Sequence, residues 1–134
     1  MIQRLRSRQQ FQAVLAGAPV VKTPHFALHR LALGSAERNP LLFPEAGPWL
    51  GVLLPKRWAR RAVTRNAIRR QIYATAPTAL ADAAHVVRLR SGFARDQFLS
   101  ASSTVLKQAV RAELLQLWAR TPVAGTPAVR GHVA

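Results

Sequence analysis

Apolar positions recur at helical spacing near the start of the chain. Phe11, Val14 and Leu15 lie three and four residues apart, the spacing that places side chains on one face of a helix. Ser7 stands where an N-cap is needed, and a Gly-Ala-Pro stretch follows the apolar positions. The pattern therefore predicts a short amphipathic helix over residues 7–16.

Three later segments have the pattern of strands. Residues 25–33 carry apolar side chains at both odd and even positions, so both faces of this strand are expected to be at least partly covered. Residues 49–54 form a short apolar run bounded by prolines, which predicts a buried strand, and residues 84–89 centre on two valines and predict a third. Residues 34–48 are rich in Gly, Pro, Asn and Glu, a composition that predicts a long surface loop or an open hairpin connection.

Two more segments have helical periods. In the segment 61–76, Ile68 and Ile72 form an apolar stripe. The segment 95–118 is predicted to be the longest helix. Its apolar positions are Phe98, Leu99, Val105, Leu106, Ala109, Val110, Leu114 and Leu117. The segment 121–134 has no period and is predicted to be a disordered tail.

The order of these elements predicts the fold class. One strand, helix, strand unit with flanking helices favours an α+β domain, an α/β sandwich with a small central sheet flanked by helices. The chain has 134 residues and a hydrophobic content of 49%, both typical of one globular domain. We therefore expect a single domain over residues 1–120.

The charge of the chain is strongly positive. It carries 20 Lys+Arg against 5 Asp+Glu, a net charge of +15, and all the cations except Lys22, Lys56 and Lys107 are arginine. Arginine binds phosphate through two parallel hydrogen bonds and stacks on bases, so this bias favours nucleic acid over acidic surfaces in general.

The positive charge is concentrated between the second predicted strand and the end of the 61–76 helix. No carboxylate interrupts this segment, and Trp58 and Tyr73 provide flat surfaces on which a base could stack. On the helix, the polar positions sweep an arc that begins beside the apolar stripe. The cations of the segment are Lys56, Arg57, Arg60, Arg61, Arg65, Arg69 and Arg70, and we expect them to bind a polyanion rather than to be merely solvated.

Several classes of site are excluded or disfavoured. The chain has no cysteine, and its histidines lack metal-ligand spacing, so we expect no metal site in the protein. No segment approaches the roughly 20 apolar residues of a membrane span, and no secretory signal begins the chain, so a soluble intracellular protein is expected. The five acids are not paired as a two-metal nuclease would need, and each is expected to serve capping or solvation.

The basic segment resembles the signature of the bacterial ribonuclease P protein subunit. That signature is Lys-Lys, a short variable stretch, and Arg-Asn-Arg-x-Lys-Arg-x-x-Arg; this chain has Lys56-Arg57, then WARRAVT, then RNAIRRQIY. The spacing agrees throughout, and RLRSRQQFQAVLAG, HFALHRL, LGV and HVVRLR resemble the family's first helix and its strands. The resemblance covers roughly residues 4–118.

The chain departs from the family pattern at several positions. Within the signature, Ala67 and Tyr73 each stand where the family has a cation, while Arg69 replaces a lysine and keeps the charge. Leu15 replaces a second aromatic residue of the first helix, and His29 replaces a tyrosine of the first strand.

The resemblance implies a fold and a function. The fold would include a left-handed βαβ crossover, in the order α-β-β-(β)-α-β-α. The function would be that of a cytoplasmic bacterial subunit that helps a catalytic RNA, with Mg²⁺ bound to the RNA, to remove the 5′ leader from precursor transfer RNA. The protein itself would perform no bond chemistry.

The resemblance also assigns residues to two RNA sites. Phe11, Leu15 and His29 would line a cleft for the single-stranded leader. The RNA-binding set is Lys56, Arg57, Arg60, Arg61, Arg65, Asn66, Arg69, Arg70 and Tyr73, with Arg60 and Arg61 expected to compensate for the departures at Ala67 and Tyr73.

Two other classes remain open at this stage. A structural or ribosome-associated RNA-binding protein would have the same size and charge. A DNA-binding architectural protein is less favoured, since the sequence has no evident helix-turn-helix and no zinc ligands.

Overall fold

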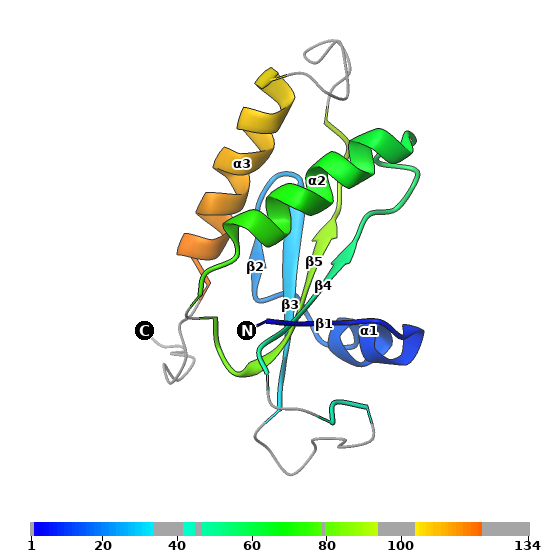
Figure 1. Ribbon diagram of the computed structural model, residues 1–134, viewed down its shortest axis with the longest axis vertical. Helices are drawn as coiled ribbons and strands as arrows, with labels where there is room; N and C mark the ends of the chain where they lie inside the picture. The colour runs from blue at the N-terminus through cyan, green and yellow to red at the C-terminus, as the bar shows by residue number, and fades with distance from the viewer. Residues whose placement is uncertain (1, 34–41, 45–46, 79, 94–103, 122–134) are drawn as a thin grey trace.

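The computed structural model describes residues 2–33, 42–44, 47–78, 80–93 and 104–121, which form one sheet with helices on both of its faces (Figure 1). The observed class is therefore the predicted mixture of helices and a small central sheet.

The sheet has five strands in the order β1-β4-β5-β3-β2. Its central strand β5 (Ala83–Leu89) runs parallel to β4 (Trp49–Leu53) and antiparallel to β3 (Phe26–Ala32). The edge strands β1 (Gln3–Arg4) and β2 (Val21–Lys22) were not predicted, because two residues are too few to produce an alternating pattern.

The three helices of the described residues cover the two faces of the sheet. Helix α1 (Arg8–Leu15) packs on one face, whereas α2 (Ala62–Thr75) and α3 (Thr104–Ala119) pack on the other (Figure 1). The predicted boundaries of the first two helices are confirmed to within one residue. The start predicted for the third helix, with Phe98 and Leu99, falls outside the described residues.

Two apolar clusters explain this arrangement. Alternate side chains of β3 and β5 point to opposite faces, so that Leu28 and Val87 join the α2–α3 cluster, whereas Val86 joins the α1 cluster. Ile68 and Ile72, the stripe predicted for α2, are 2% and 0% exposed. Both faces of β3 are covered, as its sequence predicted.

The connection from β4 through α2 to β5 is left-handed. With both strands running upward in Figure 1, α2 lies in front of the sheet and the chain returns to β5 on the left of β4. This is the hand that the resemblance implied. It is the opposite of the hand of almost all parallel crossovers.

The start of α1 is fixed by a capping box. Ser7 Oγ accepts a hydrogen bond from the backbone N–H of Gln10 at 3.1 Å, and Gln10 Oε1 accepts one from the backbone N–H of Ser7 at 3.1 Å. Gln10 Nε2 also donates to Leu42 O at 2.9 Å, which ties the helix to the connection between β3 and β4. The predicted N-cap is confirmed.

The predicted surface loop over residues 34–48 needs a correction. Phe43 is 1% exposed, and its ring packs edge-on against the Trp49 ring with 5.7 Å between the ring centres. Part of this segment therefore belongs to the core of the α1 face. The segment is not a hairpin connection either, because β5 lies between β3 and β4. Residues 34–41 and 45–46 lie outside the described part of the chain.

The boundary of the predicted tail also moves by one residue. Thr121 is buried, and its hydroxyl donates to Leu117 O at 2.8 Å, so the packed structure continues to this residue. The rest of the segment predicted to be disordered, residues 122–134, lies outside the described residues.

His85 predicts a loss of stability in acid. It is fully buried on β5, where Nδ1 contacts Trp49 O at 3.1 Å and Nε2 accepts from Arg30 Nε at 3.1 Å. Burial lowers the pKa of His85 from 6.5 to about 4, with a smaller lowering by Arg30, and the hydrogen bond to Trp49 only partly opposes it. Between these two values the unfolded chain binds a proton that the folded chain does not. Stability from this group is therefore complete above pH 6.5, and roughly 3 kcal/mol is lost as the pH falls to 4.

Urea unfolding at several pH values measures this loss. A His85→Gln variant has no imidazole to titrate, so the stability difference between it and the wild-type chain should shrink over the same pH interval. A constant difference would show that His85 does not cause the acid sensitivity.

Candidate nucleic-acid interface

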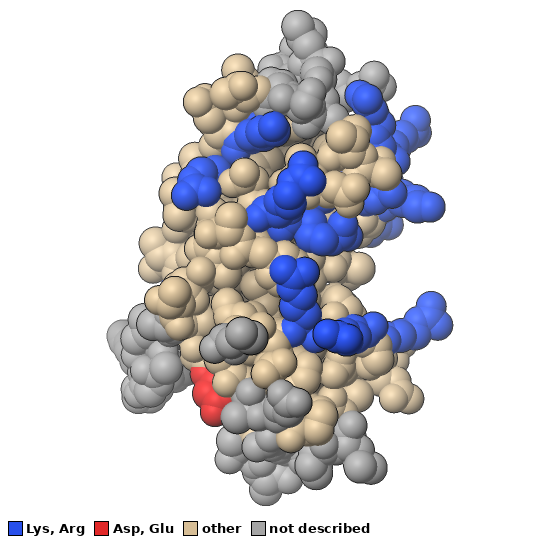
Figure 2. Space-filling view, viewed as in Figure 1, with Lys and Arg blue, Asp and Glu red and all other residues tan. Residues whose placement is uncertain are grey.

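The predicted RNA-binding residues lie on one continuous part of the molecule, the loop after β4 and the outer side of α2. The buried side of α2 consists of Ala67, Ile68 and Ile72, which turns the polar side away from the sheet. In Figure 2 basic side chains gather over α2. We call this set the basic surface: Lys56, Arg57, Arg60, Arg61, Arg65, Asn66, Arg69 and Arg70.

The basic surface is not neutralised by the protein. In the described part of the chain, none of its cations forms an ion pair with a carboxylate. The first turn of α2 also has no acidic residue, and Arg61 at its N-cap makes no capping bond through its side chain. The free amide groups of the helix start therefore add to the positive potential of the surface.

Arg65 has a structural role within the basic surface. Its Nη1 donates to Ala59 O at 2.9 Å and to Arg60 O at 2.8 Å, so the side chain folds back and fastens the loop to the start of α2. Arg65 is half-buried, and its other guanidinium donors are not used by these two bonds. It can hold the shape of the loop and still bind a phosphate.

Asn66 orients a neighbouring cation. Its Oδ1 accepts a hydrogen bond from Arg69 Nη1 at 3.0 Å, one turn along the helix. The remaining donors of Arg69 stay available, and Arg70 beside it is exposed. Trp58, in the preceding loop, is 36% exposed and has the Arg57 guanidinium 5.1 Å from its ring centre.

Tyr73 differs from the rest of the predicted set because it is half-buried between α2 and the sheet. Its hydroxyl donates to Leu50 O at 3.3 Å, and the Arg4 guanidinium lies 4.1 Å from its ring centre. Burial raises the pKa of the Tyr73 hydroxyl, and the nearby charges of Arg4 and Arg69 partly offset this rise. Arg4 was missed in the sequence because its partner is 69 positions away in the chain.

The predicted leader residues lie on the opposite face of the sheet, beside α1. The Phe11 ring packs where Gly51 of β4 has no side chain: a Cβ there would approach Phe11 Cε1 and Cζ to 2.8 Å. Leu15 is half-buried at the edge of the same cluster. Both residues therefore combine a packing role with partial exposure, as an aromatic or apolar contact surface requires.

Gly51→Ala should disturb this face. The new methyl group would meet Leu5 Cδ1 at 2.7 Å as well as the Phe11 ring, so α1 or its side chains must move. We expect a loss of about 1–3 kcal/mol in the free energy of unfolding, the usual range for overpacking. Gly17→Ala is the control, because its Cβ would meet nothing within 4 Å. Equal stability of the two variants would contradict the close packing of Phe11.

His29 lies on the α1 face, where its ring holds the side chain of Arg88. Its Nδ1 donates to Gly17 O at 3.0 Å, which leaves Nε2 to accept from Arg88 Nε at 3.4 Å. Burial, and to a lesser extent the charge of Arg88, lower the pKa of His29 against the raising effect of the Gly17 bond. Burial therefore favours the neutral form of His29, and Arg88 carries the positive charge of this pair.

Arg88 was absent from the predicted site. It shares the α1 face with Val86, two residues before it on β5, and this alternation was visible in the sequence. The pairing of β5 with β3, which brings Arg88 to His29, was not visible there.

The prediction that each acid serves only capping or solvation is wrong for Glu113. Its carboxylate is 11% exposed and contacts Thr23 and His25 at the turn between β2 and β3. Within the described residues, no group of three His, Cys, Asp or Glu could hold a metal ion. The described helices are also too short or too polar to cross a membrane.

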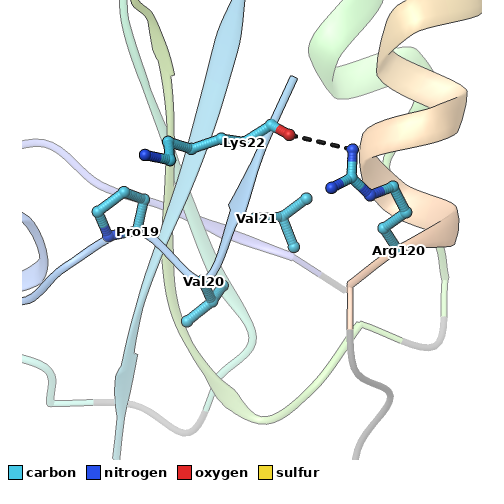
Figure 3. Close-up of a pocket in the computed structure, with 5 residues that line it drawn as sticks. All are labelled: Pro19, Val20, Val21, Lys22 and Arg120. Atoms are coloured by element: carbon cyan, nitrogen blue, oxygen red, sulfur yellow. Dashed lines mark hydrogen bonds between the residues drawn. The ribbon is translucent and has the colours of Figure 1, made fainter. Parts of the chain in front are cut away.

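One open depression lies at the other edge of the sheet (Figure 3). It has a volume of about 230 Å³, and Arg120 Nη1 donates to Lys22 O at 3.0 Å across one side of it. Its lining residues are Pro19, Val20, Val21, Lys22 and Arg120. None of the predicted site residues belongs to it.

Comparisons with known proteins identify the family of this chain. The family model described as ribonuclease P matches residues 2–121. The ribonuclease P protein component of Ralstonia pickettii is 31% identical over 130 residues, covering 93% of this chain and 84% of that protein. The corresponding protein of Bordetella parapertussis is 33% identical over 114 residues, covering 83% of this chain and 85% of that protein.

A solved structure supports the same fold. The ribonuclease P protein of Staphylococcus aureus superimposes with a TM-score of 0.61 at 17% identity, over 87% of this chain and 93% of that one. Together with the family model and the relatives, this shows that the chain belongs to the ribonuclease P protein family.

Proposed function

We propose that this chain is the RNA-binding subunit of ribonuclease P and assists a catalytic RNA in removing the 5′ leader from precursor transfer RNA. The observation that carries the proposal is the basic surface, a set of cations on one helix and its preceding loop that no described carboxylate neutralises. Such a surface is built to bind phosphates.

The basic surface is proposed to bind the RNA backbone. Arginines present a planar fork of donors that matches a phosphate, and α2 with its fastened loop holds several of them on a rigid element. If about six phosphates are contacted, the logarithm of affinity should fall with the logarithm of salt concentration at a slope near −4 to −5. A flat salt dependence would contradict an electrostatic interface.

The α1 face is proposed to bind the single-stranded leader. Phe11 and Leu15 provide apolar area on which bases can pack, and Arg88, held by His29, provides a cation beside it. This combination of a stacking surface and a positive charge is typical of sites for unpaired nucleotides.

The chemistry is assigned to the RNA partner and its Mg²⁺. Among the described residues, both oxygens of Glu113 already accept hydrogen bonds, and Asp82 stands alone on the surface. These residues do not fit a magnesium site, which needs carboxylate oxygens that are free to bind the metal. The contribution of the protein is to bind and position RNA, in the bacterial cytoplasm.

Cleavage of precursor transfer RNA tests this proposal directly. A bacterial ribonuclease P RNA is assayed at low Mg²⁺ with and without the protein, and the new 5′ end is mapped. We expect strong stimulation at the mature 5′ end and no cleavage by the protein alone. Tight, salt-sensitive RNA binding without stimulation would instead place the chain among structural RNA-binding proteins.

A further inference from the structure

We propose that Arg4, held in place by Tyr73, is an RNA phosphate contact that connects the basic surface on α2 with the α1 face. The inference rests on the proposed function and adds a residue from an edge strand to it. Tyr73 is then a positioning residue, whose ring sets the direction of the arginine.

The first step of the argument is that Arg4 is preorganised. Its backbone belongs to β1, which pairs with β4 in parallel, and the neighbouring Leu5 amide donates to Leu50 O at 3.1 Å. Its guanidinium lies 4.1 Å from the centre of the Tyr73 ring. The Tyr73 hydroxyl is itself bound to Leu50 O, so ring and strand are fixed relative to one another. An arginine held at both ends loses little conformational entropy when it binds an anion.

The second step is that the donors of Arg4 remain open. The residue is exposed, and its guanidinium lies over the face of an aromatic ring, a contact that uses none of its N–H donors. Within the described residues, no carboxylate pairs with it. A cation stacked on a ring keeps its full charge and can still donate to a phosphate.

The third step is position. The residues that flank β1 show which way its side chains alternate: Ile2 packs with the α2–α3 cluster and Leu5 with the α1 cluster. Arg4 points to the α2 side, where its charge and that of Arg69 both act on the Tyr73 hydroxyl. In Figure 2 basic side chains continue from α2 toward the region of β1 and α1. A strand of RNA that contacts both surfaces would therefore pass this edge of the sheet.

The fourth step is the chemistry of the occupant. The Arg4 guanidinium lies over the Tyr73 ring, and the charges of Arg4 and Arg69 both act on the Tyr73 hydroxyl, while no described carboxylate pairs with either arginine. Like charges gathered around one residue in this way favour the binding of an anion. Phosphates spaced regularly along RNA satisfy two such cations at once. These phosphates could belong to the leader or to the catalytic RNA, and the experiment must separate the two sources.

The experiment measures RNA affinity of single variants at several salt concentrations. Arg4→Gln should weaken binding about tenfold, the usual effect of one charge-assisted hydrogen bond, and reduce the magnitude of the salt slope by roughly 0.7–0.9. Lys22→Gln is the matched control, since it removes one cation from β2 at the opposite edge of the sheet. It should change affinity less than about twofold.

Tyr73 variants test the positioning role. Tyr73→Phe keeps the ring and loses only the hydroxyl bond to Leu50 O, so it should weaken RNA binding less than Tyr73→Leu, which removes the ring. Tyr73→Leu should weaken it no further when Arg4 is already Gln, which a purely structural role would not produce. Melting curves should show that each variant is folded. Additive losses in the double variant would overturn the positioning role.

Three RNAs identify the source of the phosphates: the catalytic RNA alone, precursor transfer RNA with its leader, and transfer RNA without a leader. A loss confined to the RNA with a leader assigns Arg4 to the leader, and a loss with the catalytic RNA assigns it there. Equal effects of Arg4→Gln and Lys22→Gln on all three RNAs would overturn the inference. If Arg4→Gln had no specific effect but the double variant Arg69→Gln, Arg70→Gln weakened binding, the proposed function would stand without the role of Arg4. If the double variant also had no effect, the role of Arg4 and the proposed function would both fail.

Discussion

Replacing Arg69 and Arg70 together by glutamine is expected to weaken binding of the catalytic RNA by about 100-fold or more. A hydrogen bond to a charged group contributes about 1.5–3 kcal/mol, so the loss of two phosphate contacts exceeds a factor of 100 in affinity. Both side chains lie on the outer side of α2, away from the buried stripe. The fold should therefore survive, and a melting curve close to that of the wild-type chain would confirm it.

The control for this pair must remove the same charge elsewhere. Lys22→Gln with Arg120→Gln takes two cations from the β2 edge and the end of α3, where the Arg120 side chain binds Lys22 O. We expect only a small loss of affinity for this control, caused by the lower net charge. Equal losses for the two double variants would mean that the protein attracts RNA by its total charge and has no shaped interface.

Arg65 should behave differently from these two arginines. Since its Nη1 fastens the loop through Ala59 O and Arg60 O, Arg65→Gln would release the loop that carries Lys56 and Arg57. The sequence placed Arg65 on the basic arc of the helix, but it could not show these bonds. The bonds depend on how the loop folds back, which the helical period does not describe.

The difference between local and long-range information explains what could be predicted. The stripe of Ile68 and Ile72 follows from the 3.6-residue period within one helix, and the cap at Ser7 follows from residues three positions apart. Both were predictable because every partner lies within one or two turns. The basic surface was predictable for the same reason, as one loop and one helix carry it.

The strand pairing was not predictable from periodicity alone. Arg88 meets His29, and Arg4 meets Tyr73, only because the strand order of the sheet places β5 between β3 and β4 and β1 beside β4. The left-handed crossover entered through the resemblance, because general rules favour the opposite hand. Sequence therefore predicts the parts of the site that lie within one helix or loop. The parts that depend on strand pairing can be seen only in the structure.

Glu113 is the residue whose role is most difficult to predict from local sequence patterns. On a long helix a single acid has the pattern of a solvated side chain, yet Oε2 accepts from Thr23 Oγ1 and from the His25 amide, both at 2.6 Å. Oε1 lies 2.7 Å from His25 Nδ1, and the His25 ring stacks on Phe93 at 3.9 Å. One carboxylate on α3 thus holds the turn that joins β2 to β3. Its partners precede it by 88 and 90 positions, so no local pattern could reveal them.

Glu113→Ala is accordingly expected to lower the free energy of unfolding by about 3–5 kcal/mol, as when one partner of a buried charged contact is removed. Thr23 is 4% exposed, so its hydroxyl would lose its carboxylate partner in a place that water reaches poorly. Urea unfolding measures the change. Glu113→Gln should lose less, because an amide keeps one acceptor oxygen but cannot serve all three donors.

Asp82→Asn separates this local effect from the general effect of charge. It removes the same negative charge from a strongly basic chain, but Asp82 is exposed and forms no hydrogen bond through its side chain with the described residues, so we expect a change within about 0.5 kcal/mol. If Glu113→Ala and Asp82→Asn destabilised the protein equally, the cause would be repulsion among the arginines. If only Glu113→Ala did so, the cause would be the contact between α3 and the β2–β3 turn. In that case Glu113 stabilises the sheet that carries Arg4 and Arg88. RNA binding by the Glu113→Ala variant should then recover at temperatures low enough to keep the variant folded.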